Sequence, residues 1–356
     1  MIEDDRQVAN VIGLGLVGGS IGMGLRQRGW RVCGEDTNRG TVERALAAGA
    51  IDHVGLDRDA AITFVAVPVL AVTDQVKRAL DDTNGAVTDV GSVKAPICDA
   101  CDDPRFVGGH PMAGSELDGL DGADGEMFNG AVWVLTPGPH TDGRTLSSVT
   151  GVVKLLDAEV VALAPDRHDQ VVAVVSHVPH LAAATLMTLA ADRAEEHAAL
   201  LRLAAGGFRD MTRIASGHPA IWLDICAENR PAIVAALDGL LDRLQEIRGV
   251  VEREDRGALH DTLSRARDAR TNLPGRVTHP EAMAEVRIPI PDRTGAAAEL
   301  FTLAAELGVN IANFEVVHMA ESNRGLAVVL VDAAASELFR GGLMARGFKP
   351  AVTPLV

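Results

Sequence analysis

The first 165 residues alternate short apolar runs with stretches whose apolar positions repeat at helical spacing. The runs have the length of buried strands, and the stretches between them are long enough for helices. This alternation predicts a doubly wound α/β domain over residues 1–165, with a largely parallel sheet covered by helices on both faces. The expected strands are Val8–Leu14, Arg31–Glu35, Ile62–Val67, Ala86–Val90 and Ala131–Leu135.

The pattern changes after Pro165. From there to Asn272, long stretches rich in Ala, Leu, Val and Ile carry helical spacing, which predicts an all-helical domain over residues 166–272. Breaks are expected at Pro179, at the Gly206–Gly207 pair and at Pro231. Pro179 should kink its helix or end it, because proline lacks the amide hydrogen and its ring crowds the preceding turn.

Residues 273–283, which include Pro274, Gly275 and Pro280, are expected to be a linker to a third unit over residues 284–356. This unit has the order strand, helix, strand, strand, helix, strand, which is the ferredoxin-like βαββαβ order. The expected segments are the strand Ala284–Pro289, the turn Asp292–Gly295, the helix Ala296–Leu307, the strand Ile311–Met319, the turn Glu321–Gly325 and the strand Leu326–Asp332, followed by a helix and a last strand.

Composition agrees with a packed protein of several domains, since the chain has 356 residues, of which 47% are hydrophobic and 23% charged. The formal net charge of -16 repels phosphate backbones and anionic lipids, so neither nucleic acid nor a membrane is expected as a partner. The first residues are acidic where a secretory signal would be basic, and no apolar run reaches the ~18 residues that span a bilayer. A cytoplasmic protein is therefore expected.

A glycine-rich turn follows the first expected strand. The segment Gly13–Gly18 reads G-L-G-L-V-G, which matches the dinucleotide-binding G-x-G-x-x-G motif of Rossmann domains in the strand–turn–helix context that the motif requires. Asp36 ends the next strand, where a carboxylate binds a ribose 2'-hydroxyl, and this favours NAD over NADP, although Arg39 nearby would suit a 2'-phosphate. The residues expected to bind the cofactor are Gly13, Leu14, Gly15, Leu16, Val17, Gly18 and Asp36.

Two further segments indicate a substrate site. Asp89–Lys94 reads D-V-G-S-V-K at the end of an expected strand, which is where doubly wound sheets bind ligands. Lys94 is either part of this site or an ordinary solvated lysine. Gly108–Glu116 reads G-G-H-P-M-A-G-S-E and places His110 among small residues that leave room for a ligand.

These segments resemble the prephenate/arogenate dehydrogenase family, whose characteristic strings are similar to G-L-G-L-I-G-G-S, D-x-G-S-V-K and G-H-P-x-A-G-[ST]-E. Ser176–His180 and Gly207–Ala215, followed by Trp222, resemble the helical-domain motifs of the same family. The resemblance spans roughly residues 8 to 272 and implies NAD-dependent oxidative decarboxylation of a cyclohexadienol, prephenate or arogenate. In this reaction the ring carbon that bears the hydroxyl loses a hydride, carbon dioxide leaves the opposite carbon, and the ring becomes aromatic.

The resemblance implies a role for each matching residue. His110 is the base that receives the hydroxyl proton, a role that suits an imidazole because it titrates near neutral pH. Ser92 helps to orient His110 and the hydroxyl. Arg213 pairs with a substrate carboxylate through its bidentate fork. The remaining assignments are substrate contacts at His180 and Ser176, supporting or gating roles for Glu116 and Asp210, either a core or a ligand role for His177, and packing for Trp222.

Metal and redox chemistry are not expected. Cys98 and Cys101 form one C-x-x-C pair without a second pair to complete a zinc site, so they are read as small residues after a strand. His110, His177 and His180 lack metal-binding spacing.

The C-terminal unit resembles the ACT regulatory domain through its D-R-T-G turn at Asp292–Gly295 and the G-V-N-I segment at Gly308–Ile311. Such domains pair across a subunit interface, so the resemblance implies a homodimer. It also implies an amino-acid effector, with tyrosine as the first candidate and phenylalanine as its rival, bound near Asp292, Gly295 and Asn310. A dimerisation module without a ligand is the alternative.

Other functions stay open at this point. A 3-hydroxyacid or imine reductase of the same architecture would need a lysine in the helical domain, and residues 166–272 contain none. A non-catalytic NAD-binding sensor would not need Ser92, His110 and Arg213 together. The sequence does not separate prephenate from arogenate, because few side-chain contacts would differ.

Overall fold

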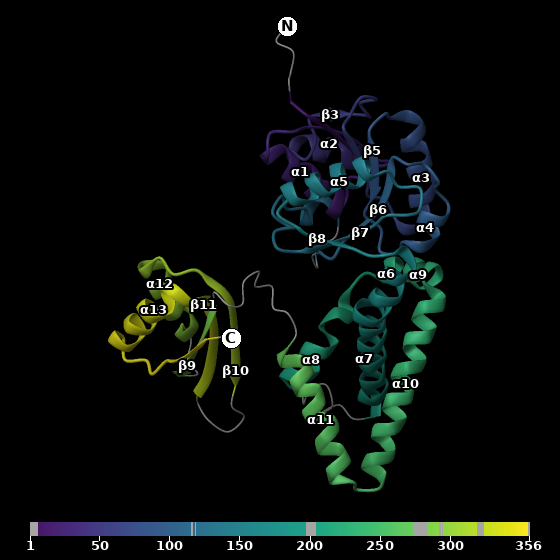
Figure 1. Cartoon of the computed structure of the whole chain (residues 1–356). Helices are drawn as coiled ribbons and strands as arrows, with labels where there is room; N and C mark the ends of the chain where they lie inside the picture. Colours follow the sequence, from purple (N-terminus) through teal and green to yellow (C-terminus); the bar gives the residue numbers. More distant parts are fainter. Residues whose placement is uncertain are drawn as a thin grey trace. The chain divides into compact units, whose positions relative to one another are not determined.

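A computed structural model describes residues 6–114, 117, 119–196, 204–272, 283–291, 293, 295–318 and 324–354. Contacts divide the chain into two compact units, Met1–Leu259 and His260–Val356. The first unit contains an α/β part and then a helical part, and the second contains a small sheet with two helices (Figure 1). The division falls within helix α11 (Arg256–Thr271), so the domain boundaries expected from the sequence stay predictions.

An eight-stranded sheet in the order β3-β2-β1-β4-β5-β6-β7-β8 forms the α/β part. Neighbouring strands are parallel except β6 and β7. The strands are β1 (Val8–Ile12), β2 (Arg31–Glu35), β3 (His53–Val54), β4 (Ile62–Val65), β5 (Ala86–Asp89), β6 (Phe106–Pro111), β7 (Val132–Thr136) and β8 (Glu159–Ala162). The helices are α1 (Leu16–Gln27), α2 (Arg39–Ala47), α3 (Val69–Asp82), α4 (Ala95–Asp99) and α5 (Gly143–Leu155), with a 3-10 turn at Gly119–Gly122.

Both faces of this sheet are covered, as the doubly wound pattern predicts. Successive residues of β1 enter different cores: Val11 packs in a cluster that includes Ile21 of α1, whereas Ile12 packs in one that includes Val72 of α3. This follows from the alternation of side chains along a strand, and it explains why the strands read as continuous apolar runs.

Three strands were not predicted: β3, β6 and β8. The most important is β6, whose sequence F-V-G-G-H-P contains glycines and a proline that are unfavourable in strands. The segment is nevertheless buried along its whole length between β5 and β7. His110 therefore lies on a strand of the sheet.

The helical part consists of α6 (Pro165–Val172), a π-helical turn (Ala173–His177), α7 (Val178–Glu196), α8 (Gly206–Thr212), a 3-10 turn (Arg213–Ser216), α9 (Pro219–Glu228), α10 (Arg230–Glu252) and α11. The all-helical prediction is confirmed for the residues that the structure describes. Two other expected breaks fall where helices begin, since Gly206 begins α8 and Pro231 lies in the first turn of α10, where proline is well tolerated.

Pro179 does not end its helix, so of the two predicted outcomes, a kink or an end, the second is wrong. The chain stays helical from α6 into α7, and the amide of Val178 donates to the carbonyl of Ala173 across a wide π-type turn. A π turn is one residue longer than an α turn. The irregularity expected at the proline therefore appears as an extra residue in the helix immediately before it.

One stretch also differs from the expectation about membranes. By length and composition alone, the helical stretch Pro165–Arg193 meets the requirement for a bilayer span. The same stretch carries the buried polar side chains of His168, Asp169 and His177, which belong to the site described below.

The two parts of the first unit share a core. Val93, in the loop after β5, packs with Ala173 of the π-helical turn, Ile225 of α9 and Ile233 of α10. The helical part is therefore anchored next to the carboxyl ends of the central strands, where doubly wound sheets bind ligands.

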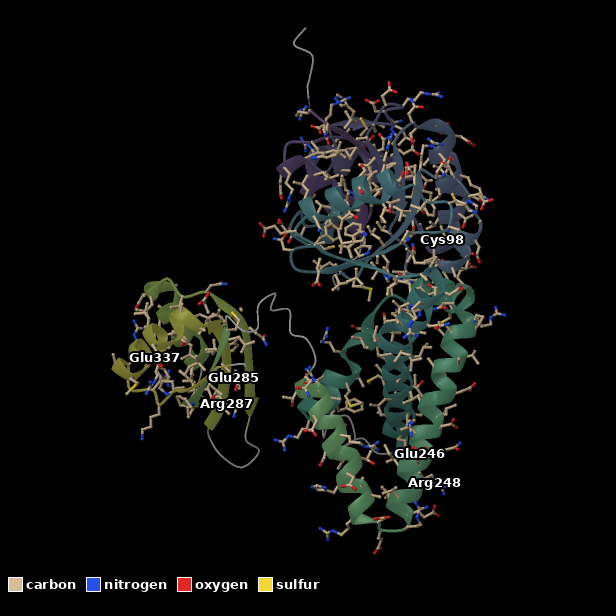
Figure 2. The ribbon with its side chains drawn as sticks, viewed as in Figure 1. Cys98, Glu246, Arg248, Glu285, Arg287 and Glu337 are labelled. Atoms are coloured by element: carbon tan, nitrogen blue, oxygen red, sulfur yellow. The ribbon has the colours of Figure 1, made fainter. Side chains whose placement is uncertain are left out.

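The C-terminal unit is an antiparallel sheet in the order β10-β11-β9-β12 with two helices packed on one core. Its elements are β9 (Met283–Pro291), α12 (Ala296–Leu307), β10 (Ile311–His318), β11 (Arg324–Asp332), α13 (Ala333–Ala345) and β12 (Ala351–Pro354). This confirms the βαββαβ order. Glu285 and Arg287 form an ion pair along β9, with 2.6 Å between Oε1 and Nε (Figure 2).

Candidate active site

The glycine turn after β1 has the geometry that a dinucleotide requires. Gly13 has a φ of +91°, and a Cβ added at Gly18 would lie 1.9 Å from the carbonyl oxygen of Gly13, so strand and helix pack too closely for a side chain. A Cβ added at Gly15, by contrast, would meet nothing within 4 Å. The open space beside Gly15, at the N-terminus of α1, fits the approach of a pyrophosphate to backbone amides.

Asp36 lies beside this turn. Its carboxylate accepts a hydrogen bond of 2.9 Å from the amide of Leu14 and one of 2.8 Å from the amide of Asn38. These bonds fix the acid next to the glycine turn, where it would face an adenosine ribose. Arg39, which the sequence offered as a 2'-phosphate ligand, is exposed and pairs with Glu43 at 3.2 Å.

Lys94 is not a solvated lysine. Its side chain is fully buried, its ammonium forms an ion pair with Asp89 at the end of β5, and it donates a hydrogen bond of 2.8 Å to the carbonyl of Gly109. Asp89 also accepts hydrogen bonds from the amides of Gly91 and Gly109. Buried charges of this kind are retained only where they are paired, so Lys94 joins β5 to β6 directly under the candidate site.

A chain of hydrogen bonds leads from β6 into the helical part. His110 is buried on β6, and its Nδ1 lies 2.9 Å from Nε2 of His168 on α6. Nδ1 of His168 lies in turn 2.8 Å from Oδ1 of Asp169. The Asp169 carboxylate also accepts hydrogen bonds from the amides of Lys94 (2.8 Å) and Ala95 (2.9 Å), so it ties α6 to the start of α4.

The same segment reaches a third histidine through Asn229. The side-chain amide of Asn229 donates to the carbonyl of Asp169 at 2.9 Å and lies 3.2 Å from Nδ1 of His177. His177 is buried in the π-helical turn, and its Nε2 has no hydrogen-bond partner among the residues that the structure describes. From the sequence alone, His177 was either a core residue or a ligand contact.

Three histidines of the site, His110, His177 and His180, share a direction of pKa shift. Burial lowers the pKa of His110 well below 6.5, and His168, Lys94 and His177 lower it further. Burial lowers the pKa of His177 to about 4, although Asp169 opposes the shift. Burial also lowers the pKa of His180. All three are therefore neutral imidazoles at neutral pH, able to donate through one nitrogen and accept through the other.

His180 and Trp222 form a stacked pair at the edge of the site. Their ring centroids are 3.6 Å apart with 13° between the planes, and the His177 ring meets the same indole edge-on at 6.1 Å. A Cβ added at Gly217 would lie 3.4 Å from His180. Gly217, at the end of the 3-10 turn that begins at Arg213, therefore lies close to the His180 ring.

The other predicted residues fall around this cluster. Ser92 is half-buried in the loop after β5, and Ser176 is half-buried in the π-helical turn. Arg213 and Asp210 are exposed at the end of α8, so the structure does not bring them into the buried network itself. Glu116 lies outside the described residues.

Cys98 lies on α4 (Figure 2) and, like Cys101, is a free thiol. Burial raises the pKa of Cys98 to about 11, and burial likewise raises the pKa of Cys101, so both are protonated at neutral pH. The Cys98 thiol contacts Thr136 of β7 at 3.5 Å, which gives it a packing role. Within the described part of the chain, no group of three or more His, Cys, Asp or Glu is placed to hold a metal ion.

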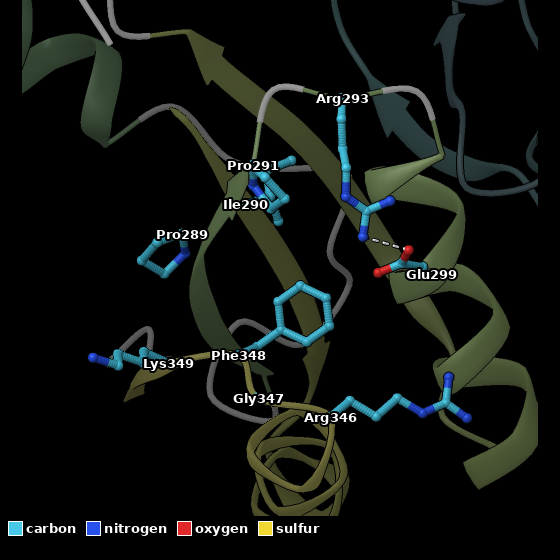
Figure 3. Close-up of a pocket in the computed structure, with 9 residues that line it drawn as sticks. All are labelled: Pro289, Ile290, Pro291, Arg293, Glu299, Arg346, Gly347, Phe348 and Lys349. Carbon is cyan, nitrogen blue, oxygen red and sulfur yellow. Dashed lines mark hydrogen bonds and ion pairs between the residues drawn. The ribbon is translucent and has the colours of Figure 1, made fainter. Parts of the chain in front are cut away.

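In the C-terminal unit, Gly295 has a φ of +87° at the start of α12, and Asn310 is exposed before β10. Asp292 lies outside the described residues. A hollow of about 380 Å³ opens next to this turn (Figure 3). It is lined by Pro289, Ile290, Pro291, Arg293, Glu299, Arg346, Gly347, Phe348 and Lys349. Arg293 pairs with Glu299 at 2.7 Å and Arg346 pairs with Glu306, so Lys349 supplies the remaining positive charge of the lining.

Sequence reasoning missed His168, Asp169 and Asn229. They occur in ordinary helical sequence, in the first turns of α6 and between α9 and α10, and only the fold brings them to β6. One signal was present: a histidine followed by an aspartate, in a helix that begins at a proline.

Comparison with known proteins gives a consistent result. Residues 21–162 match the nucleotide-binding domain of prephenate dehydrogenases, and residues 164–265 match the dimerization domain of the same enzymes. A prephenate dehydrogenase of Bacillus subtilis is 33% identical over 330 residues, which are 88% of this chain and 89% of the relative.

Two solved structures extend the comparison. Prephenate dehydrogenase from A. aeolicus, in complex with hydroxyphenyl propionate and NAD+, has a TM-score of 0.71 and 29% identity over 76% of this chain and 99% of that one. Synechocystis arogenate dehydrogenase has a TM-score of 0.65 and 29% identity over 74% of this chain and 99% of that one.

Proposed function

The chain belongs to the prephenate dehydrogenase family, and we propose that it catalyses the NAD-dependent oxidative decarboxylation of prephenate to 4-hydroxyphenylpyruvate in tyrosine biosynthesis. The observation that carries this proposal is the neutral, buried imidazole of His110 in a hydrogen-bonded chain at the ends of the sheet strands. A dehydrogenase needs such a proton acceptor beside its nicotinamide.

The glycine turn and Asp36 would hold NAD, as the space beside Gly15 and the position of the carboxylate allow. The nicotinamide, when bound, supplies the acceptor for the hydride that leaves the ring carbon. His110 accepts the hydroxyl proton as that carbon approaches a carbonyl. The proton returns to the same oxygen when the electrons released with carbon dioxide reach it, so the ring ends as a phenol and no net proton is consumed.

The other residues position the substrate in this proposal. Ser92, in the loop between β5 and α4, orients the hydroxyl and His110. Arg213 pairs with a substrate carboxylate, since a guanidinium offers a bidentate fork. His180, held flat against Trp222, and Ser176 contact the substrate from the helical part, with Glu116 and Asp210 in supporting roles.

A single assay tests the activity. The full-length protein is incubated with NAD and either prephenate or arogenate, and NADH absorbance is followed. We expect turnover with prephenate, and a loss of kcat of about 10²-fold or more in His110→Asn. No turnover with either substrate would support the non-catalytic sensor. Normal turnover in His110→Asn would remove that residue from the mechanism.

Arogenate is the alternative substrate. The observation that favours it is the similarity to the Synechocystis structure, whose name is arogenate dehydrogenase. A higher kcat/KM with arogenate than with prephenate in the assay above would select this reading.

We also propose that the protein is a cytoplasmic homodimer. The match to a dimerization domain supports this, as do the exposed apolar side chains Leu241, Leu244 and Val251 along α10. Exposed apolar rows on a helix are typical of a subunit interface. Sedimentation should give twice the chain mass, and a monomer at micromolar concentration would contradict it.

The C-terminal unit is proposed to bind an amino acid, tyrosine first and phenylalanine second, as an ACT domain does. Its βαββαβ order and the left-handed Gly295 at the start of α12 support this, because the free amides of a helix start suit a carboxylate. Asp292, Gly295 and Asn310 are the proposed contacts. Titration of the full chain with each amino acid should release or absorb heat and change turnover. The absence of both effects would indicate a dimerisation module without a ligand.

A further inference from the structure

We propose that His168 and Asp169 are positioning residues that act through His110: they fix which ring nitrogen of His110 carries hydrogen, and they take up its charge when it accepts a proton. This inference rests on the function proposed above. It concerns residues that the family motifs quoted earlier do not contain. The Asp169 carboxylate sets the direction of the hydrogen bonds in this chain, because its backbone partners can only donate.

Both oxygens of Asp169 accept hydrogen bonds from backbone amides, those of Lys94 and Ala95. An ionised carboxylate, the ordinary form of an aspartate at neutral pH, only accepts hydrogen bonds and cannot donate to His168. Nδ1 of His168, 2.8 Å away, therefore carries a hydrogen. A neutral imidazole has one hydrogen, so Nε2 of His168 is an acceptor.

The next bond then has one direction. Nδ1 of His110 lies 2.9 Å from the bare Nε2 of His168 and must donate to it. The other nitrogen of His110, Nε2, is left with a lone pair. This is the tautomer that a proton acceptor needs, and the opposite tautomer would present an N–H to the substrate hydroxyl.

The pair also supplies basicity that His110 lacks alone. Burial, His168, Lys94 and His177 all lower the pKa of His110, although the charge of Lys94 is partly offset by Asp89. When Nε2 of His110 takes the hydroxyl proton, its Nδ1 hydrogen passes to Nε2 of His168. His110 stays neutral, and the positive charge lies on His168 against the carboxylate of Asp169. Both shifts reverse when the proton returns to the phenol oxygen.

Two variants of His168 separate the two roles. In His168→Gln the side-chain oxygen still accepts from His110 near the old Nε2 position but cannot take a proton, whereas His168→Asn is too short to do either. We expect kcat to fall roughly tenfold or more in His168→Asn and less in His168→Gln. The acid limb of the kcat profile should move to lower pH in both, because the protonated pair loses the carboxylate.

The decisive measurement is a double-mutant cycle with His110→Asn. If His168 acts through His110, adding His168→Asn to His110→Asn changes kcat no further, because the residues act as one unit. Equal losses in both backgrounds, or no loss in either single variant of His168, would overturn the inference. Normal turnover in His110→Asn would also overturn the inference, because His110 would then have no part in the reaction. Absence of any turnover in the wild type would instead count against the proposed function, and the two failures are thereby distinguished.

A second inference comes from an independent observation, the buried Nε2 of His177. The nitrogen of Asn229 that bonds to the carbonyl of Asp169 must be the amide nitrogen, and its second hydrogen points to Nδ1 of His177. Nδ1 is thus an acceptor, and Nε2 carries a hydrogen that has no partner among the described residues. We infer that this N–H donates to an anionic oxygen of the substrate, in the carboxylate class.

Conservative variants of His177 test this, since glutamine reproduces a donor near Nε2 and asparagine does not. His177→Asn should raise KM for the substrate by about tenfold or more with little change in kcat, and His177→Gln should raise it less. The KM for NAD serves as the control and should not move. Equal effects of the two variants on the substrate KM, or none, would overturn the inference, whereas absence of any turnover in the wild type would count against the proposed function.

Discussion

Two of the carboxylate–cation pairs, Lys94 with Asp89 and Arg293 with Glu299, are alike in charge and differ in their surroundings. Lys94 and Asp89 are both fully buried under the histidine cluster, and the pair is closed by hydrogen bonds to the backbone of β6. Arg293 and Glu299, beside the C-terminal hollow, are each about half exposed. Burial makes the first pair part of the architecture, whereas water screens the second. The free energy of unfolding should therefore depend much more on the first pair than on the second.

The largest effect should follow from breaking the buried pair. Lys94→Met removes the ammonium and leaves the Asp89 carboxylate uncompensated, which costs about 3–5 kcal/mol of unfolding free energy. Thermal unfolding of the full chain, followed by calorimetry so that separate transitions are resolved, measures the loss. The double variant with Asp89→Asn should recover part of it, since no charge is then left unpaired. A loss below about 1 kcal/mol in Lys94→Met would mean that the pair is solvated.

The next largest effect should be a loss of stability at low pH in the first unit, which contains His177. The pKa of His177 is about 4 in the fold and 6.5 ordinarily, so below 6.5 the unfolded chain takes up a proton that the folded chain refuses. The free energy of unfolding is therefore unaffected by His177 above pH 6.5, and it decreases by up to about 3 kcal/mol as the pH falls from 6.5 to 4. His177→Gln has no titrating group and should lose less stability over this range. Identical melting profiles against pH would contradict the buried, neutral state.

A smaller loss is expected where the nucleotide turn meets α1. Gly18→Ala puts a Cβ 1.9 Å from the Gly13 carbonyl oxygen, so the backbone must shift, at a cost of about 1–3 kcal/mol. Gly15→Ala is the matched control, because it has open space and should keep the melting temperature while weakening NAD binding. If both variants melted like the wild type, the tight contact between strand and helix would be wrong.

The smallest effect should come from the exposed pair. Arg293→Ala removes the partner of Glu299 and should change unfolding free energy by about 0–1 kcal/mol, with a weaker effect still at high salt. The same calorimetry as for Lys94→Met gives the direct contrast. A loss comparable to that of the buried pair would erase the distinction between the two regions.

Local sequence patterns predicted most of the fold and the glycine turn after β1. The glycines, Asp36 and the βαββαβ order each follow from residues close together in sequence, where spacing and propensity act. β6 was not predicted, because glycine and proline are unfavourable in strands and this strand is stabilised by its neighbours on both sides.

The partners of His110 could not be found in this way. His168 is 58 residues from His110, and Asn229 is 60 residues from Asp169, so only the packing of α6 against β7 and of α10 against α6 brings them together. Lys94 shows the same limit. Its sequence context fits a solvated lysine equally well, and only the three-dimensional structure shows that its side chain is buried. Long-range polar pairing is set by tertiary structure and leaves little trace in a single sequence.

The π-helical turn Ala173–His177 makes this protein sensitive to length as well as to residue type. Deleting one residue there would restore a regular α-helix and rotate everything beyond it by about 100° relative to α6. His168 and Asp169 would keep their places while His180 swung away from the others. The relative orientation of the site histidines thus depends on one extra residue in this turn. Variants should therefore tolerate substitutions in the turn more readily than a change in its length.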